Sequence, residues 1–411
     1  IWTQHLDRSA RRPVMVWFHG GGMMTGSGVE HYAYDGEELS SFGDVVVVTL
    51  NHRLNVLGFL DLSAYGEEYR YSGNAGIADL TAALEWIRDN IMSFGGDPDN
   101  VMIFGQSGGG AKVVTMLQSK KAAGLFHRAC VQSGGMRHTE DITPELSQRL
   151  AAFVLEEMGI LPEHVKEIER VFYEELALAA DRAMKRLSKE TGKRIMFGPV
   201  TDHVFYSGHP YRNGFIRETL DTPLLCGSVF GEFLNNFASP VGEGSKNSWT
   251  PEYIRHLLIQ EYGDKADALI ASFTETYPDK TPADLLFLDA QMRRDTLEFA
   301  RLRALSSKAG VYNFLFNLES PFNGGTVPWH NAEIPYIFHN AEYLEASFIP
   351  GITPELQDIV SGAWVNFAKT GDPHGIGVPL WKAVTQKEDN TMIFDRKCSC
   401  RANHDRELIA V

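Results

Sequence analysis

The chain has 411 residues, of which 44% are hydrophobic, and its 53 acidic and 38 basic residues give a formal net charge of −15 at pH 7. This composition is typical of a globular protein with a large core, and it excludes a disordered or collagenous chain. Because the chain is acidic and has no long Lys/Arg run, no positive field attracts phosphate backbones, and we expect no nucleic-acid partner.

Neither a membrane span nor a metal site is predicted. The longest apolar runs, residues 14–18 and 45–48, have the length of buried strands and fall far short of the about 20 residues that cross a bilayer. The four cysteines (130, 226, 398 and 400) show no metal-ligand spacing, so we expect free thiols, no metal and no cofactor. No signal peptide follows Ile1, which leaves a soluble protein in either the cytoplasm or a secreted compartment.

The first 135 residues alternate short β-branched runs with helical patterns, which is typical of a mostly parallel sheet with crossover helices. The predicted elements here are central strands at 13–18 and 44–50, an amphipathic helix at 76–94, a buried strand at 101–104, and a small-residue helix after Ser107. We therefore predict an α/β fold, with a mostly parallel central sheet and helices on both of its faces.

The middle of the chain changes character, because residues 143–193 and 250–309 are rich in Glu, Lys, Arg, Ala and Leu and read as helices. Thr-Pro pairs predict helix starts with Thr as the N-cap, at residues 143–144, 250–251, 281–282 and 353–354. Strand patterns return at residues 195–200, 223–229 and 311–316. We expect one domain over residues 1–411, with helical cap insertions at roughly 143–193 and 245–310.

The strongest chemical signal is the segment Gly105-Gln106-Ser107-Gly108-Gly109, which follows a predicted strand and opens a predicted helix. This G-x-S-x-G pattern in a strand–turn–helix context is typical of a nucleophile elbow, in which a strained serine exposes its hydroxyl group. Glycines two residues before and after the serine are needed because a Cβ atom there would meet the neighbouring strand or helix. The alternative is a glycine-rich turn that serves only packing.

A second signal, His19-Gly20-Gly21-Gly22, follows the first predicted strand. Consecutive glycines leave backbone N–H groups uncovered, so they can bind the negative oxygen that develops during acyl transfer. A flexible loop is the plainer interpretation. The presence of both patterns at strand ends favours an oxyanion hole beside a nucleophile.

A serine nucleophile needs a base and an orienting acid later in the chain. We select His330 as the base, because it lies in a loop that follows the predicted strand at 311–316. We select Glu232 as the acid, because it comes just after the predicted strand at 223–229 and is flanked by two phenylalanines that would desolvate it.

The whole chain resembles the type B carboxylesterases, the α/β-hydrolase family of para-nitrobenzyl esterases, carboxylesterases, cholinesterases and the non-catalytic neuroligins, and we expect a bacterial-type member. Beyond the HGGG and GQSGG patterns, the resemblance rests on residues 51–60 (NHRLNVLGFL), 73–79 (GNAGIAD), 94–98 (FGGDP), 132–134 (QSG), 333–336 (EIPY) and the positions Trp364, Phe367, Ala368, Gly371 and Pro373.

The resemblance implies a catalytic triad, an oxyanion hole and two supporting residues. These are Ser107 as nucleophile, Glu232 as acid and His330 as base, the N–H groups of Gly21, Gly22 and Gly108, and Ser133 and Gln106 beside the triad. The chain departs from the family where Gln106 replaces the usual Glu, Gly108 the usual Ala, and Asn331 the usual Gly. An N-terminal portion of the family fold is also expected before Ile1.

These residues together predict a serine carboxylesterase that acts through an acyl-enzyme on small or aromatic esters. A catalytically silent binding or adhesion protein on the same fold is one alternative. A lipase is the other, although the charged cap sequences offer little of the apolar surface that lipid aggregates require.

Overall fold

The computed structural model describes residues 1–137, 142–234, 242–375 and 377–410. In this part of the chain one sheet contains eight strands, in the order β2-β1-β3-β4-β5-β6-β7-β8. The strands are β1 (Arg12–Phe18), β2 (Val46–Thr49), β3 (Gly96–Gln106), β4 (Arg128–Gln132), β5 (Leu224–Val229), β6 (Val311–Phe316), β7 (Asn390–Phe394) and β8 (Ser399–Ala402). All neighbouring strands from β2 to β7 pair in parallel, and only β7 and β8 are antiparallel.

Strand β2 lies at one end of this strand order, so the prediction of a central strand at residues 44–50 is wrong. Its outer side is covered by Trp2, whose backbone N–H donates to Val47 O at 2.9 Å and whose carbonyl accepts from Val47 N–H at 3.0 Å. A continuous valine run is typical of a central strand because both faces of such a strand are buried. Strand β2 is also buried on both faces, although it ends the described sheet. The isolated antiparallel bridge between Trp2 and Val47 thus pairs some of the backbone N–H and C=O groups on the outer side of β2.

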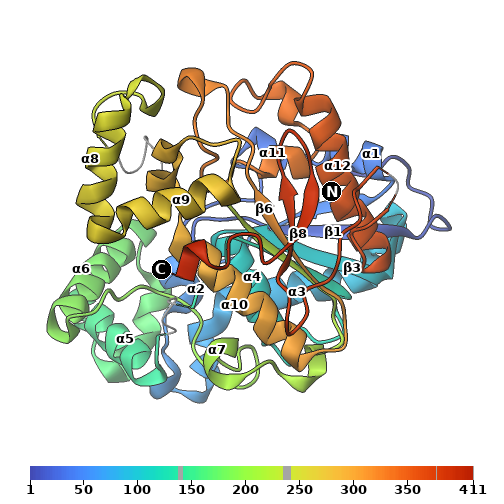
Figure 1. The fold of residues 1–411 in the computed structure, drawn as a ribbon. Coiled ribbons are helices and arrows are strands. Elements are labelled where there is room, and N and C mark those ends of the chain that lie inside the picture. Colours follow the sequence, from blue (N-terminus) through green and yellow to red (C-terminus); the bar gives the residue numbers. More distant parts are fainter. Residues whose placement is uncertain (138–141, 235–241, 376, 411) are drawn as a thin grey trace.

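Helices cover both faces of the sheet, as predicted (Figure 1). The helices are α1 (Glu37–Gly43), α2 (Asn55–Phe59), α3 (Ala75–Asn90), α4 (Gly108–Leu117), α5 (Pro144–Met158), α6 (Tyr173–Thr191), α7 (Pro210–Asn213), α8 (Pro251–Tyr262), α9 (Ala266–Thr276), α10 (Ala290–Ser306), α11 (Ile334–Ile337) and α12 (Thr353–Thr370). Helices α3, α4 and α10 share one apolar cluster with the sheet, and α1, α11 and α12 share the other. The structure is thus an α/β-hydrolase fold.

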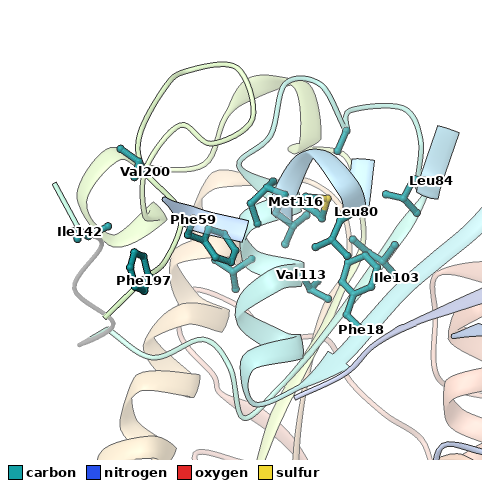
Figure 2. Close-up of a cluster of buried hydrophobic side chains, with 14 of the residues drawn as sticks. Phe18, Phe59, Leu80, Leu84, Ile103, Val113, Met116, Ile142, Phe197 and Val200 are labelled. Carbon is teal, nitrogen blue, oxygen red and sulfur yellow. The ribbon is translucent and has the colours of Figure 1, made fainter. Parts of the chain in front are cut away.

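The two apolar clusters follow from the alternation of side chains along each strand. In β1, Val14, Val16 and Phe18 face one cluster, while Met15 and Trp17 face the other. Figure 2 shows the first cluster, in which Leu80 and Leu84 of α3 and Val113 and Met116 of α4 lie beside Phe18 and Ile103 of the strands. Burial on both faces fixes the strand register, and therefore the positions of the loops at the strand ends.

Four helices of the two charged segments lie to one side of the sheet in Figure 1, with α5 and α6 below α8 and α9. The last helix of the second segment, α10, packs against β5 and β6. Three of the four threonine N-caps are present: Thr143 and Thr250 each accept a backbone N–H bond, and Thr281 forms a capping box with Asp284. Thr353 is instead the first residue of α12, and its hydroxyl oxygen accepts from Ile349 N–H at 2.8 Å.

The strand predicted at residues 195–200 is wrong, because this segment forms no strand. Ile195, Phe197 and Val200 are buried, whereas Met196 is exposed. Figure 2 shows Phe197 and Val200 near Phe59 at the outer end of the first cluster. The backbone of Val200 bonds to a side chain in place of a strand: its N–H donates to Asn74 Oδ1 at 2.9 Å, and its carbonyl accepts from Asn74 Nδ2 at 2.6 Å. The apolar pattern correctly indicated that side chains of this segment are buried, but the strand pairing that it predicted does not form.

None of the helices in the described ranges is both long and apolar enough to cross a membrane.

Replacing Asn74 by Ala removes both partners of the buried Val200 backbone. Since an unsatisfied buried polar group costs about 1–3 kcal/mol, we expect the free energy of unfolding in urea to fall by about 2–4 kcal/mol. The control is Asn90→Ala, because the Asn90 amide donates to Trp86 O at an exposed position. Its effect should stay within about 0.5 kcal/mol. Equal losses in both variants would show that the amide does not replace a strand partner.

Candidate active site

Ser107 occupies a sharp turn between β3 and α4, with φ 59° and ψ −124°. A residue other than glycine rarely adopts a positive φ, so the surrounding structure must hold the Ser107 backbone in this conformation. The Ser107 N–H donates to Gln132 O of β4 at 2.8 Å, and the Ser107 carbonyl accepts from Ala111 N–H at 3.0 Å. The turn leaves Ser107 partly exposed between two buried neighbours. This is the geometry expected of a nucleophile elbow.

The glycines around Ser107 are required by close backbone contacts. A Cβ atom on Gly105 would lie 2.6 Å from the carbonyl carbon of Gly109, and one on Gly109 would overlap the carbonyl oxygen of Phe18. A Cβ atom on Gly108 would overlap the backbone nitrogen of Gly22. The elbow and the glycine loop after β1 therefore touch through their backbones.

The loop after β1 exposes backbone donors next to Ser107. Gly21 and Gly22 have φ of 79° and 64°, a left-handed conformation that favours glycine. Within the described residues, neither N–H group donates to another protein group. Gly108 is the first residue of α4, where an N–H group has no partner inside the helix. The Gly22 backbone therefore lies against Gly108 at the start of α4, beside the turn that carries Ser107.

Glu232 follows β5, is fully buried, and is hydrogen-bonded at both carboxylate oxygens. Its Oε1 accepts from Ser133 Oγ at 2.6 Å and from Val229 N–H at 2.9 Å. Its Oε2 bonds to Nδ1 of His330, and its backbone carbonyl accepts from the His330 N–H at 2.9 Å. A buried carboxylate needs such partners to remain charged. The geometry fixes the orientation of the His330 ring.

The remaining nitrogen of the His330 ring, Nε2, is buried and has no hydrogen-bond partner in the described part of the chain. Gln106, next to Ser107, donates from Nε2 to the His330 carbonyl at 3.0 Å and so ties the histidine loop to the elbow. The Phe233 ring packs on the imidazole with centroids 3.9 Å apart. All the residues indicated by the sequence thus lie at the carboxyl edge of strands β1, β3, β4, β5 and β6.

A second buried carboxylate, Glu333, lies close to Glu232, and the sequence analysis assigned it no role. Its Oε1 accepts from Gln132 Nε2 at 3.1 Å, and its Oε2 has no partner among the described residues. Burial, with a smaller contribution from Glu232, raises the pKa of Glu333 to about 7. Both Glu333 and Gln132 belong to the family motifs in the sequence, which signalled a role without indicating which one.

An unpartnered imidazole nitrogen, a strained serine and a group of free backbone N–H donors define a serine-hydrolase-type site on an α/β-hydrolase fold. Such a site needs no metal, and no group of three or more His, Cys, Asp or Glu residues in the described ranges could hold one. The four cysteines are free thiols.

Comparisons with known proteins agree with this class. The model of the carboxylesterase family matches residues 1–408. The para-nitrobenzyl esterase of Bacillus subtilis (strain 168) is 32% identical over 405 residues, which cover 97% of this chain and 79% of that protein. A solved esterase of Clostridium hathewayi, reported to hydrolyse aliphatic aromatic polyesters, is 43% identical, with a TM-score of 0.94 over 99% of this chain and 80% of that one. A carboxylesterase of Geobacillus stearothermophilus has a TM-score of 0.74 and 32% identity, over 99% and 83% of the two chains.

The chain therefore belongs to the type B carboxylesterase family, and its activity is the hydrolysis of carboxylic esters.

Gly109→Ala tests the close contact at the elbow. The added Cβ atom meets the Phe18 backbone, which cannot move without distorting β1, so we expect the free energy of unfolding in urea to fall by about 3 kcal/mol or more. Gly198→Ala is the control, since nothing lies within 4 Å of a Cβ atom there. A Gly109→Ala protein as stable as the control would contradict the packing described above.

The raised pKa of Glu333 predicts that the stability of the protein depends on pH. Because its pKa lies near 7 in the folded protein against 4.5 in its usual range, the folded state retains a proton that the unfolded chain releases between these values. Stability should therefore fall as pH rises from about 4.5 to 7, by up to about 3 kcal/mol. Glu333→Gln should remove this slope in urea unfolding measured across the interval. An unchanged slope would assign the pH dependence to another group.

Proposed function

We propose that Ser107, Glu232 and His330 are the catalytic triad of this carboxylesterase, and that Gly21, Gly22 and Gly108 supply its oxyanion hole. The observation that carries the proposal is the chain of hydrogen bonds from Ser133 through Glu232 to His330, which leaves only Nε2 of the imidazole without a partner in the described residues. Gln106 donates to the backbone carbonyl of the same histidine and so ties its loop to the elbow. A base positioned in this way can take the proton of Ser107.

The first half of the reaction forms the acyl-enzyme. His330 Nε2 takes the proton of Ser107 as Oγ attacks the ester carbonyl carbon, and the carbonyl oxygen becomes an anion held by the glycine N–H groups. Glu232 stabilises the imidazolium that forms. The tetrahedral intermediate then collapses, the bond to the alcohol oxygen breaks, and the imidazolium returns its proton to the leaving alcohol.

The second half repeats these steps with water. His330 Nε2 takes a proton from water as its oxygen attacks the acyl carbon, and the second tetrahedral anion occupies the same hole. Its collapse breaks the bond to Ser107 Oγ, which recovers the proton from the imidazolium. The acid is released and the enzyme returns to its initial state.

We further propose small or aromatic esters as the substrates. Phe233 supports an aromatic preference, because its side chain is 48% exposed and packs on the His330 ring. An exposed aromatic surface beside the base can contact a flat acyl or alcohol group through ring stacking. The Clostridium hathewayi esterase, whose reported substrates are aliphatic aromatic polyesters, adds support.

Ser107→Ala removes the nucleophile and should lower kcat for a p-nitrophenyl ester by about 10⁴-fold or more, because the triad acts as one unit. The control is Ser306→Ala, which removes an exposed hydroxyl that bonds within its own helix, and which should keep full activity. Retained activity in Ser107→Ala would refute the assigned nucleophile.

Glu232→Gln should lower kcat for the same ester by about 10⁴-fold, since the amide favours the wrong tautomer of the His330 imidazole.

Phe233→Leu tests the substrate preference. We expect kcat/KM for a phenyl ester to fall about 5- to 10-fold relative to that for an ethyl ester of the same acid, because a ring contact is worth about 0.5–1.5 kcal/mol beyond its area. Phe42→Leu is the matched control, because Phe42 of α1 stacks on His339 with a centroid distance of 4.2 Å. An unchanged ratio in Phe233→Leu would mean that the aromatic group binds elsewhere.

A further inference from the structure

The side chain of Lys112 lies fully buried next to the glycine loop that carries the oxyanion-hole donors. Lys112 belongs to α4, five residues after Ser107. Its Nζ donates to the carbonyl oxygen of His19 at 2.8 Å and to that of Gly20 at 3.4 Å. No carboxylate within the described ranges forms an ion pair with it. A buried cation whose partners are two backbone carbonyl groups is unusual, since most buried charges are paired.

The groups that face Lys112 are two imidazoles and one more distant carboxylate. The rings of His19 and His52 stack with centroids 5.2 Å apart. Burial, assisted by Lys112, lowers the pKa of His19 to about 4 and that of His52 to about 3, so both rings are neutral near pH 7. Burial lowers the pKa of Lys112 itself to about 7, although the carboxylate of Glu30 favours the charged form. The ammonium group is thus the local positive charge that changes near neutrality.

The bonds from Lys112 act on the peptide groups of the oxyanion hole. The Gly20 carbonyl and the Gly21 N–H belong to one peptide group, which is planar and conjugated. When a cation binds the carbonyl oxygen, the peptide becomes more polarised and its N–H becomes a stronger donor. The Gly20 carbonyl also accepts from His19 Nδ1 at 2.9 Å, which adds to the polarisation. Both bonds also fix the orientation of the peptide.

We propose that Lys112 is a positioning residue for ester hydrolysis: its ammonium group holds the His19 and Gly20 carbonyls, and thereby aims and strengthens the Gly21 N–H that binds the oxyanion. This inference rests on the proposed oxyanion hole. It explains why a helix that is otherwise apolar carries a buried lysine at this point. A methionine would fill the same space without the cost of burying a charge.

The first test compares wild-type protein with Lys112→Met. Removing a whole oxyanion-hole donor typically costs 10²- to 10³-fold in rate, so weakening one should lower kcat by about 10- to 100-fold with little change in KM. Affinity for a trifluoromethyl ketone, which forms a tetrahedral anion on serine, should fall in parallel. Lys246→Met is the matched control, because Lys246 is also buried but pairs with Asp284 at 2.7 Å. It should lower stability and leave kcat unchanged.

The pH dependence separates this role from simple packing. The ratio of wild-type to Lys112→Met kcat should fall as pH rises through about 7, because only the wild type has an ammonium group to lose. A folded Lys112→Met protein with unchanged kcat, or a rate loss that is the same at every pH, would overturn the proposal.

A measurement on the wild-type protein covers the case in which Lys112→Met does not fold. In ¹³C NMR of labelled lysines, the resonance that titrates near neutrality should titrate at a higher pH after the trifluoromethyl ketone binds, because an oxyanion and an ammonium group stabilise each other. An unshifted titration would overturn the proposal. Failure of the ketone to bind at all would instead refute the proposed catalytic site, so the two failures are distinguishable.

Discussion

The site depends on the backbone contact between the elbow after β3 and the loop after β1. The carbonyl oxygen of Phe18 occupies the space that a Cβ atom on Gly109 would need, and the Gly22 nitrogen does the same at Gly108. This contact exists because β1 and β3 are parallel neighbours whose apolar faces fix their register. It brings the N–H donors of one strand end to the serine of the next, with no side chain between them.

The second requirement is the stabilisation of charges in a buried site. Glu232 remains an acceptor for His330 because a hydroxyl and a backbone N–H group satisfy its other oxygen. Glu333 lies close to Glu232 and has fewer partners, and burial raises its pKa to about 7. The buried Lys112 donates to the carbonyl groups of His19 and Gly20 in the glycine loop.

The fold, and the grouping of the candidate site residues at one edge of the sheet, could be predicted because their signals are local. A strand, a G-x-S-x-G turn and a small-residue helix are contiguous in the sequence. Because the later strands are parallel to this one, the loops that follow them lie at the same edge of the sheet. What could not be predicted depends on partners far apart in the sequence. Residues 195–200 carry a strand's apolar pattern, but Asn74, more than 120 positions earlier, takes the place of the neighbouring strand. The bonds of Lys112 to the His19–Gly20 carbonyls are equally non-local.

The edge position of β2 shows a related limit, since a valine run reports burial but not the number of neighbouring strands. Likewise, Thr353 precedes a proline as the other caps do, yet its hydroxyl bonds to the preceding loop. In such cases the local sequence predicts whether a helix or a strand forms, whereas tertiary packing decides where the element begins or which place it takes in the sheet.

The central claim is that Ser107 is an activated nucleophile, and intact-protein mass spectrometry with a fluorophosphonate tests it most directly. The reagent should add once to the folded protein, and peptide mapping should place the adduct on Ser107. Because the phosphonyl group reacts only with a serine that a base has activated, an adduct elsewhere, or none on a protein that hydrolyses esters, would contradict the account.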